Sequence, residues 1–222
     1  MNPAQGIRFI HIAICREARE IEAQAHEAES PEELAALGQR VTRFATYNKH
    51  HTDGEEDGMY AELEQKAPHV RGAYLHDHRE DNELFADVAQ RIAAASDADG
   101  ATRPGLIRAL RRQTIALTEH VLPHVHKEDT LITPLVIELF TPAEQGAQIG
   151  KMMARFPPDV LAQAVPWLIA KIDADDRVAY VSMIQRIMPP DRFAVTCGWI
   201  RGGVASGVWS DICARVPGLP SA

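Results

Sequence analysis

The chain has 222 residues, of which 45% are hydrophobic and 24% are charged, and its formal net charge is −8. This balance excludes a wholly disordered or fibrous protein, and the acidic charge argues against nucleic acid or an anionic membrane as a partner. Aromatic residues make up only 6% of the chain and alanine is abundant, so helix is favoured over sheet.

Several features of the sequence favour a cytoplasmic protein. The N-terminal residues show no basic leader followed by an apolar stretch, as a secretory signal would. No apolar run approaches the roughly 18 residues of a membrane span. The cysteines are odd in number and far apart, as expected of reduced thiols rather than a disulfide framework: they are Cys15, Cys197 and Cys213.

The first 140 residues predict four long helices. Apolar residues recur at helical spacing from Ile7 to about Ala28. The residues Ser30-Pro31-Glu32-Glu33 then supply an N-cap, a proline at the first helical position and a capping-box glutamate. The second helix can run to about Lys66, with Gly54 and Gly58 as local weak points.

The third and fourth helices are separated by a clear loop. A helix is expected over residues 69–96, a loop over 97–104 and a fourth helix over 104–140. Pro123 and Pro134 are expected to kink or divide this last helix. Four long helices with short connections predict an all-α, up-down-up-down four-helix bundle.

Residues 141–222 differ from this first part in chemistry. All ten histidines lie between His11 and His126, and the net charge changes from −9 over residues 1–140 to +1 over residues 141–222. We therefore expect two domains, 1–140 and 141–222. The second contains a weak 32-residue repeat, in which Phe156-Pro-Pro-Asp matches Met188-Pro-Pro-Asp, and Thr141 and Asp173 are candidate N-caps. It predicts a helical-hairpin extension that packs on the bundle or, in a homo-oligomer, on a second copy of the chain.

Two H-x3-E motifs carry the chemistry of the chain. They are His51-x3-Glu55 on the second expected helix and His124-x3-Glu128 on the fourth. Positions i and i+4 share one helix face, so each motif presents an imidazole and a carboxylate together, which is a natural pair of metal ligands. A single H-x3-E is weak evidence, but one on each of two helices of a bundle is much stronger.

The other two helices each offer a histidine. His11 lies within an apolar stretch, and His78 follows Asp77, with Tyr74 one turn earlier on the same face. Ligands from four helices that converge on a bundle core describe a two-metal carboxylate site. No E-x-x-H or D-x-x-H occurs, which disfavours the ferritin-like pattern. Imidazole and carboxylate together suit iron, and manganese or zinc suit the set less well. The candidate metal ligands are His11, His51, Glu55, His78, His124 and Glu128, and Tyr74, His120 and Glu56 are further candidates as ligands or as partners of ligands.

Residues 7 to about 140 resemble the hemerythrin-like HHE cation-binding family. The matching elements are His11-Ile-Ala-Ile, His51-x3-Glu55-Glu56, Asp77-His78, and His124-x3-Glu128-Asp129 followed by Pro134-Leu135. The second part more faintly resembles the helical continuation found after such domains in plant iron-sensing ubiquitin ligases. No RING-type cysteine pattern is present, so the resemblance does not imply ligase activity.

The resemblance implies a four-helix bundle with two iron ions (Fe2+/Fe3+, oxo- or hydroxo-bridged). Glu55 and Glu128 would bridge the irons, and the histidines would be terminal ligands. Respiratory hemerythrins carry H-x3-H on the third helix, where this chain has Tyr74, and H-x4-D on the fourth, where it has H-x3-E. Four histidines, two bridging carboxylates and a bridging oxygen leave about two coordination positions open, one of which Tyr74 could close as a phenolate.

Three alternative functions are consistent with these predictions. The first is a non-haem diiron protein that binds or reacts with dioxygen, peroxide or nitric oxide, including a diiron oxidoreductase acting on a small organic substrate. The second is an iron- or oxygen-responsive sensor or binding module that signals through the C-terminal helices. The third is a structural bundle whose histidines lie on the surface. The chain shows no nucleotide loop, nucleophile triad or phosphate cradle, so any reaction would depend on the metals.

Overall fold

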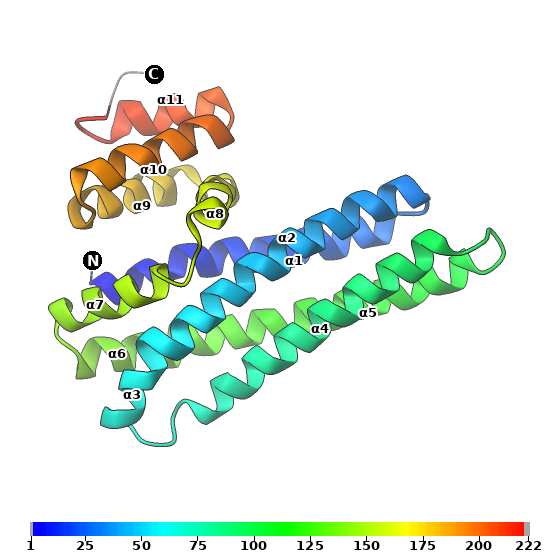
Figure 1. Ribbon diagram of the computed structural model, residues 1–222, viewed down its shortest axis with the longest axis horizontal. Helices are drawn as coiled ribbons and strands as arrows, with labels where there is room; N and C mark the ends of the chain where they lie inside the picture. The colour runs from blue at the N-terminus through cyan, green and yellow to red at the C-terminus, as the bar shows by residue number, and fades with distance from the viewer. Residues whose placement is uncertain (1, 220–222) are drawn as a thin grey trace. The chain divides into compact units, whose positions relative to one another are not determined.

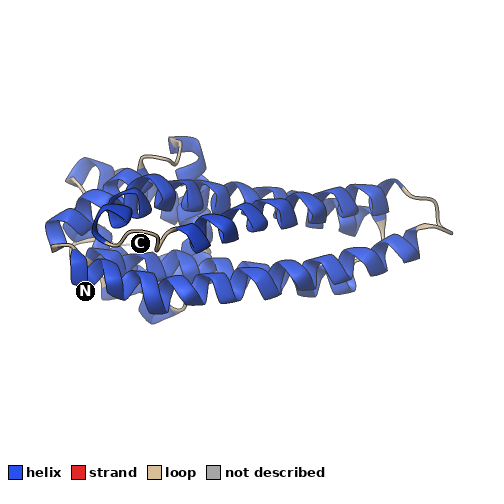
Figure 2. Cartoon of the chain, turned by 90° about the horizontal axis from the view of Figure 1, so that it is seen from below, coloured by secondary structure: helices blue, strands red, loops and turns tan. Residues whose placement is uncertain are grey.

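The computed structural model describes residues 2–219, and helices are the only regular secondary structure within that range (Figure 2). The expected all-α fold is therefore confirmed. Among the described residues, no helix combines the length and apolar character that a membrane span requires.

Four long helices run alongside one another and form the bundle (Figure 1). A short 3-10 segment, η1, precedes the first of them. Their interior is made of large apolar side chains, and the rings of Phe44 and Phe85 meet edge to face at 5.0 Å. The segments are η1 (Pro3–Ile7), α1 (Arg8–Glu27), α2 (Pro31–Glu55), α4 (Gly72–Asp97) and α5 (Arg103–Lys127).

Polar contacts also fix the first two helices. The Ser30 hydroxyl accepts a hydrogen bond from the Glu33 amide at 3.2 Å, and the Glu33 carboxylate accepts one from the Ser30 amide at 2.9 Å. This reciprocal pair is the expected capping box and begins α2. Further along α2, Arg40 donates to the buried carboxylate of Glu17 on α1 at 2.6 Å. A buried carboxylate needs such a partner, so the pair fixes the register of α1 against α2.

A π-helical segment begins directly after the first H-x3-E motif, and another begins at the glutamate of the second. The first, η2 (Glu56–Tyr60), joins α2 to α3 (Ala61–Lys66), and the second, η3 (Glu128–Ile132), joins α5 to α6 (Thr133–Leu139). Helix α5 is continuous across Pro123, and Pro134 lies in the first turn of α6. The fourth expected helix is thus interrupted by η3, before Pro134. Single π turns inside helices occur frequently at functional sites.

Helix α7 (Pro142–Met153) packs against α2 and η2 at two glycines. A Cβ at Gly54 would lie 3.1 Å from the Met152 backbone, and one at Gly58 would lie 2.9 Å from the Gln148 carbonyl oxygen. Lys151 on α7 also forms an ion pair with Glu62. The two glycines, which sequence analysis treats as weak points of a helix, are where α7 approaches most closely.

The remaining helices follow the 32-residue repeat. Helices α7, α9 and α11 begin at Pro142, Ala174 and Ser206, and α8 and α10 begin at Pro158 and Pro190. Thr141 and Asp173 cap their helices through their side chains, as expected. The bounds are α8 (Pro158–Lys171), α9 (Ala174–Ile187), α10 (Pro190–Gly203) and α11 (Ser206–Arg215).

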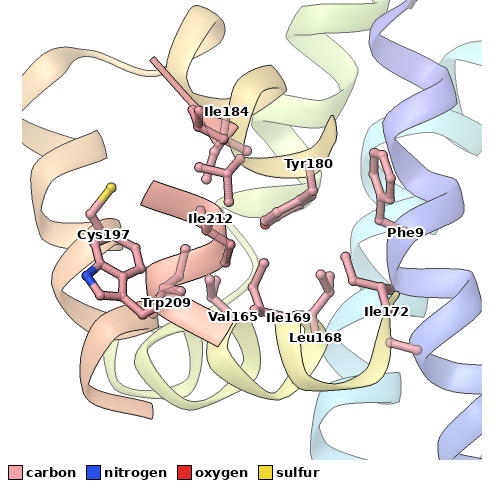
Figure 3. Close-up of a cluster of buried hydrophobic side chains, with 14 residues drawn as sticks. Phe9, Val165, Leu168, Ile169, Ile172, Tyr180, Ile184, Cys197, Trp209 and Ile212 are labelled. Atoms are coloured by element: carbon pink, nitrogen blue, oxygen red, sulfur yellow. The ribbon is translucent and has the colours of Figure 1, made fainter. Parts of the chain in front are cut away.

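A separate hydrophobic core joins α8–α11 to the start of α1 (Figure 3). Ile169, Ile200 and Ile212 are fully buried in it. The ring of Phe9 meets Tyr180 edge to face at 5.6 Å, and burial raises the pKa of Tyr180 to about 12. This core packs the C-terminal helices against one another and against the start of α1.

Backbone contacts divide the chain at other places than its composition does. One compact unit comprises residues 14–155, and the other comprises the described residues up to Ala13 together with those from Phe156 onward. Histidine content and charge change near Thr141, whereas α7 belongs by its contacts to the unit that contains the bundle. The boundary near Ala13 falls inside α1, which is one continuous helix.

The close packing of α7 predicts that Gly58→Ala destabilises the protein. The new Cβ would lie 2.9 Å from the Gln148 carbonyl oxygen as well as 2.9 Å from the Met152 side chain. The backbone oxygen cannot move aside as a side chain can, so we expect a loss of about 1–3 kcal/mol in the free energy of unfolding. Urea denaturation measures this change. Gly150→Ala is the matched control, since a Cβ there meets nothing within 4 Å, and a helical Gly→Ala change should then stabilise by up to about 1 kcal/mol. Equal stabilities of the two variants would contradict the packing role.

Candidate metal centre

All six residues expected as metal ligands are buried, and each of the four long helices of the bundle supplies at least one. His11 lies on α1, His51 and Glu55 on α2, His78 on α4, and His124 and Glu128 on α5 and the start of η3. Glu55 is 0% exposed and Glu128 is 1% exposed. Two carboxylates so deeply buried require positive charge or hydrogen-bond donors beside them.

The ligand atoms form two groups. In the first, one ligand atom from each of four residues lies within 4.8 Å of the others: these are His11, His51, Glu55 and Glu128. In the second, the same criterion joins His78, His124 and Glu128. Each group contains two imidazoles, and Glu128 belongs to both.

Glu55 also faces imidazoles of both groups. Its Oε1 lies 3.4 Å from Nε2 of His51, and its Oε2 lies 3.5 Å from Nε2 of His78. Oε1 of Glu128 lies 3.4 Å from Nε2 of His78 and 3.2 Å from Nε2 of His124. Two carboxylates therefore stand between two pairs of imidazoles, which is an arrangement suited to a pair of cations that share both carboxylates.

Two of the histidines are oriented by carboxylates behind them. Nδ1 of His78 donates to Oε1 of Glu56 at 2.9 Å, and Nδ1 of His124 donates to Oδ2 of Asp81 at 2.9 Å. These bonds place a proton on Nδ1, so Nε2 is the ring atom that faces the carboxylates of the centre and that could bind a metal ion. Histidines that bind metals nearly always donate their other ring N–H in this way.

The charges of the centre also suit cations. Burial lowers the pKa of His78, but hydrogen bonds with Glu128 and Glu55 outweigh burial and raise it to about 11. In the same way, hydrogen bonds with Asp81 and Glu128 raise the pKa of His124 to about 9 against the effect of burial. The buried carboxylates thus favour positive charge where the imidazoles meet them, and the nitrogen and oxygen donors fit iron.

The further candidates lie around these groups, and neither group includes them. Glu56 is the hydrogen-bond partner of His78. His120 donates from Nε2 to the Asp77 carbonyl oxygen at 3.2 Å, and its ring centroid lies 6.3 Å from that of His124. The buried ring of Tyr74 lies 5.7 Å from the ring of Tyr60.

Sequence analysis missed two residues, Tyr60 and Asp81. The hydroxyl of Tyr60 donates to Oε1 of Glu128. Burial, together with the charges of Glu55 and Glu128, raises the pKa of Tyr60 well above its usual value. The spacing His78-x2-Asp81 places Asp81 on the inner face of α4 and was a usable signal. Tyr60 carries no such signal, because its direction depends on the π turn.

A family model described as "Hemerythrin HHE cation binding domain" matches residues 2–137. The chain belongs to this family. The match includes both H-x3-E motifs, His11 and His78, so the resemblance drawn from those residues is confirmed. The hemerythrin HHE assignment also agrees with a buried cluster of histidines and glutamates that can bind metal.

Curated relatives of this hemerythrin HHE protein come from Arabidopsis thaliana. Zinc finger protein BRUTUS is 26% identical over 206 residues, which cover 91% of this chain and 16% of BRUTUS. Zinc finger protein BRUTUS-like At1g74770 is 22% identical over 175 residues, which cover 78% of this chain and 14% of that protein. The chain therefore spans about a sixth of the length of these relatives, and the BRUTUS alignment continues beyond the family match. No solved structure matches the chain.

The bond between Asp81 and His124 predicts that Asp81→Ala weakens metal binding without unfolding the bundle. Losing the acceptor frees the His124 ring to rotate, so we expect ferrous affinity to fall about 10–100-fold. Anaerobic equilibrium dialysis measures it. Asp87→Ala is the control, because Asp87 is exposed on the same helix. An unchanged affinity in Asp81→Ala would show that the bond does not orient a ligand.

Proposed function

We propose that this protein holds two iron ions and reacts with dioxygen or a related small oxidant such as peroxide or nitric oxide. The observation that carries the proposal is the sharing of Glu55 and Glu128 between two pairs of buried imidazoles. A single-metal site would not require two carboxylates that each face imidazoles of both pairs. Membership of a cation-binding family supports metal binding, and the donor set favours iron over manganese or zinc.

Iron in this centre would supply reversible one-electron oxidation and the capacity to bind a small oxidant. The residues of the chain provide position and shelter. His11, His51, His78 and His124 would be terminal ligands, and Glu55 and Glu128 would bridge. Leu117, Val121, Met59 and Ile132, on the ligand-bearing helices and their π segments, are buried, and apolar surroundings restrict water and tune redox potential.

The open coordination positions determine which reaction is supported. Four histidines and two bridging carboxylates provide fewer donors than two six-coordinate irons require, so a small molecule can bind. Reversible binding of dioxygen requires one sheltered vacancy, whereas a second vacancy favours reaction with peroxide or nitric oxide, or oxidation of a small organic substrate. We therefore include a metal-dependent oxidoreductase within the proposal.

The optical spectrum of anaerobic, ferrous-loaded protein on admission and removal of dioxygen tests this function. We expect a visible band to appear with dioxygen. Its loss on degassing would indicate reversible binding, and its persistence would indicate oxidation to a ferric centre. Glu55→Ala should abolish the change because it removes a shared carboxylate, while Glu83→Ala, at an exposed position of α4, should leave it intact. The proposal would be contradicted if the wild-type protein bound no iron, or if its bound iron did not react with dioxygen.

A second candidate function is an iron- or oxygen-responsive sensor that signals through the helices after the bundle. The packing of α7 favours it, since Gly54 and Gly58 flank Glu55 and both contact Met152. The candidate ligand Glu55 and the two glycines on which α7 packs thus lie within about one helical turn of each other. Metal binding commonly couples to local folding, so loss of the metal would loosen the packing of α7.

Hydrogen–deuterium exchange with and without iron tests the sensor function. We expect amides of η2 and α7 to exchange at least several-fold faster after iron is removed, because Glu55 is no longer held. Residues 86–97 of α4, beyond the centre, serve as the internal reference. If α7 and this reference respond equally, or neither responds, the coupling does not exist.

A further inference from the structure

Tyr60 of η2 contacts two of the candidate ligands. It is 0% exposed. Its hydroxyl donates to Oε1 of Glu128, on the opposite pair of helices, and its ring is stacked on that of His78, with centroids 5.7 Å apart and an interplanar angle of 19°. One residue from η2 therefore touches two candidate ligands from two other elements.

The π turn is what directs Tyr60 inward. On a regular α-helix, five residues rotate a side chain by about 140°, so Tyr60 would point well away from Glu55. In η2 the hydrogen-bond pattern closes at i+5, and the structure finds both Glu55 and Tyr60 fully buried. The π turn thus coincides with an additional polar group, the hydroxyl of Tyr60, in the interior of the centre.

Oε1 of Glu128 can take this hydrogen bond and a metal ion together. A carboxylate offers about four lone-pair sites, and the same oxygen already faces Nε2 of His78 and Nε2 of His124. The hydroxyl of Tyr60 occupies one lone pair and thereby fixes the direction of the other. A hydrogen bond to a charged acceptor is stronger and shorter than a neutral one, so it restrains the carboxylate well.

We propose that Tyr60 is a positioning residue of the centre, whose hydroxyl holds Glu128 and whose ring holds His78 in the geometry that binds the second metal ion. This role rests on the proposed two-iron function. It differs from the role considered for Tyr74 in the sequence, which was that of a phenolate ligand or a partner of a ligand. Tyr74 lies beside Tyr60, and its ring faces Nζ of Lys127 at 5.9 Å.

Two substitutions separate the contacts of Tyr60. Tyr60→Phe removes the hydroxyl and keeps the stacked ring, and Tyr60→Leu removes both. Tyr180→Phe is the control, because it deletes the hydroxyl of a buried tyrosine that belongs to the separate core of the C-terminal helices. Anaerobic equilibrium dialysis against ferrous iron, with metal analysis, gives the number and affinity of bound ions, and circular dichroism verifies that each variant is folded.

We expect the first ion to bind Tyr60→Phe normally and the second to bind about 10–100-fold more weakly, with a larger loss in Tyr60→Leu and none in Tyr180→Phe. Wild-type affinity for both ions in Tyr60→Phe would overturn the positioning role while leaving the two-iron function intact. A wild-type protein that never binds a second ion would overturn both.

A spectroscopic readout distinguishes positioning from direct ligation. Resonance Raman of the ferric wild-type protein should show no tyrosinate vibrations, because the hydroxyl of Tyr60 is engaged by Glu128. Tyrosinate modes that disappear in Tyr60→Phe would show that Tyr60 is itself a ligand, and would overturn the positioning role. Modes that disappear in Tyr74→Phe would instead assign the phenolate to Tyr74 and would equally contradict this account.

Discussion

Two carboxylates buried at the middle of a helical bundle constrain the rest of the structure. Glu55 and Glu128 are almost wholly removed from water, and an isolated buried carboxylate is very unfavourable. The bundle meets this cost by surrounding them with imidazoles from four helices and with the hydroxyl of Tyr60. A metal cation bound by the same histidines and glutamates would satisfy these carboxylates more fully, so the demand for positive charge links the fold to the capacity of the cluster to bind metal.

The two π turns make this arrangement geometrically possible. η2 begins directly after Glu55, and η3 begins at Glu128 itself. The extra residue in each turn changes which side chains face inward on the next turn. In η2 this accompanies the burial of Tyr60, and Gly58 of η2 lies against α7 together with Gly54 of α2. The same short segment therefore supports the centre on one side and a docked helix on the other.

Much of this could be predicted from sequence because it depends on regular helical spacing. The i, i+4 relation within His51-x3-Glu55 and His124-x3-Glu128 holds in the structure, and the capping box at Ser30 forms as expected. The helix starts also follow the 32-residue repeat. Each of these features is local, so a short stretch of chain determines it.

The features that sequence did not predict are departures from regular spacing or contacts between distant segments. Tyr60 points inward only because of a π turn, which no residue type encodes uniquely. Gly54 and Gly58 look like helix-weakening residues until α7, about ninety residues later, is placed against them. Asp81 could have been predicted to face inward, since it follows His78 by three residues. Its role as a hydrogen-bond acceptor depends on His124, which lies opposite it.

Anomalous diffraction from crystals of iron-loaded protein at the iron absorption edge tests the central claim most directly. The account predicts two iron peaks within the bundle, about 3.5–4 Å apart as in other two-metal sites. One peak should adjoin His11 and His51, the other should adjoin His78 and His124, and Glu55 and Glu128 should contact both. A single peak, or iron bound away from these two glutamates, would contradict the account.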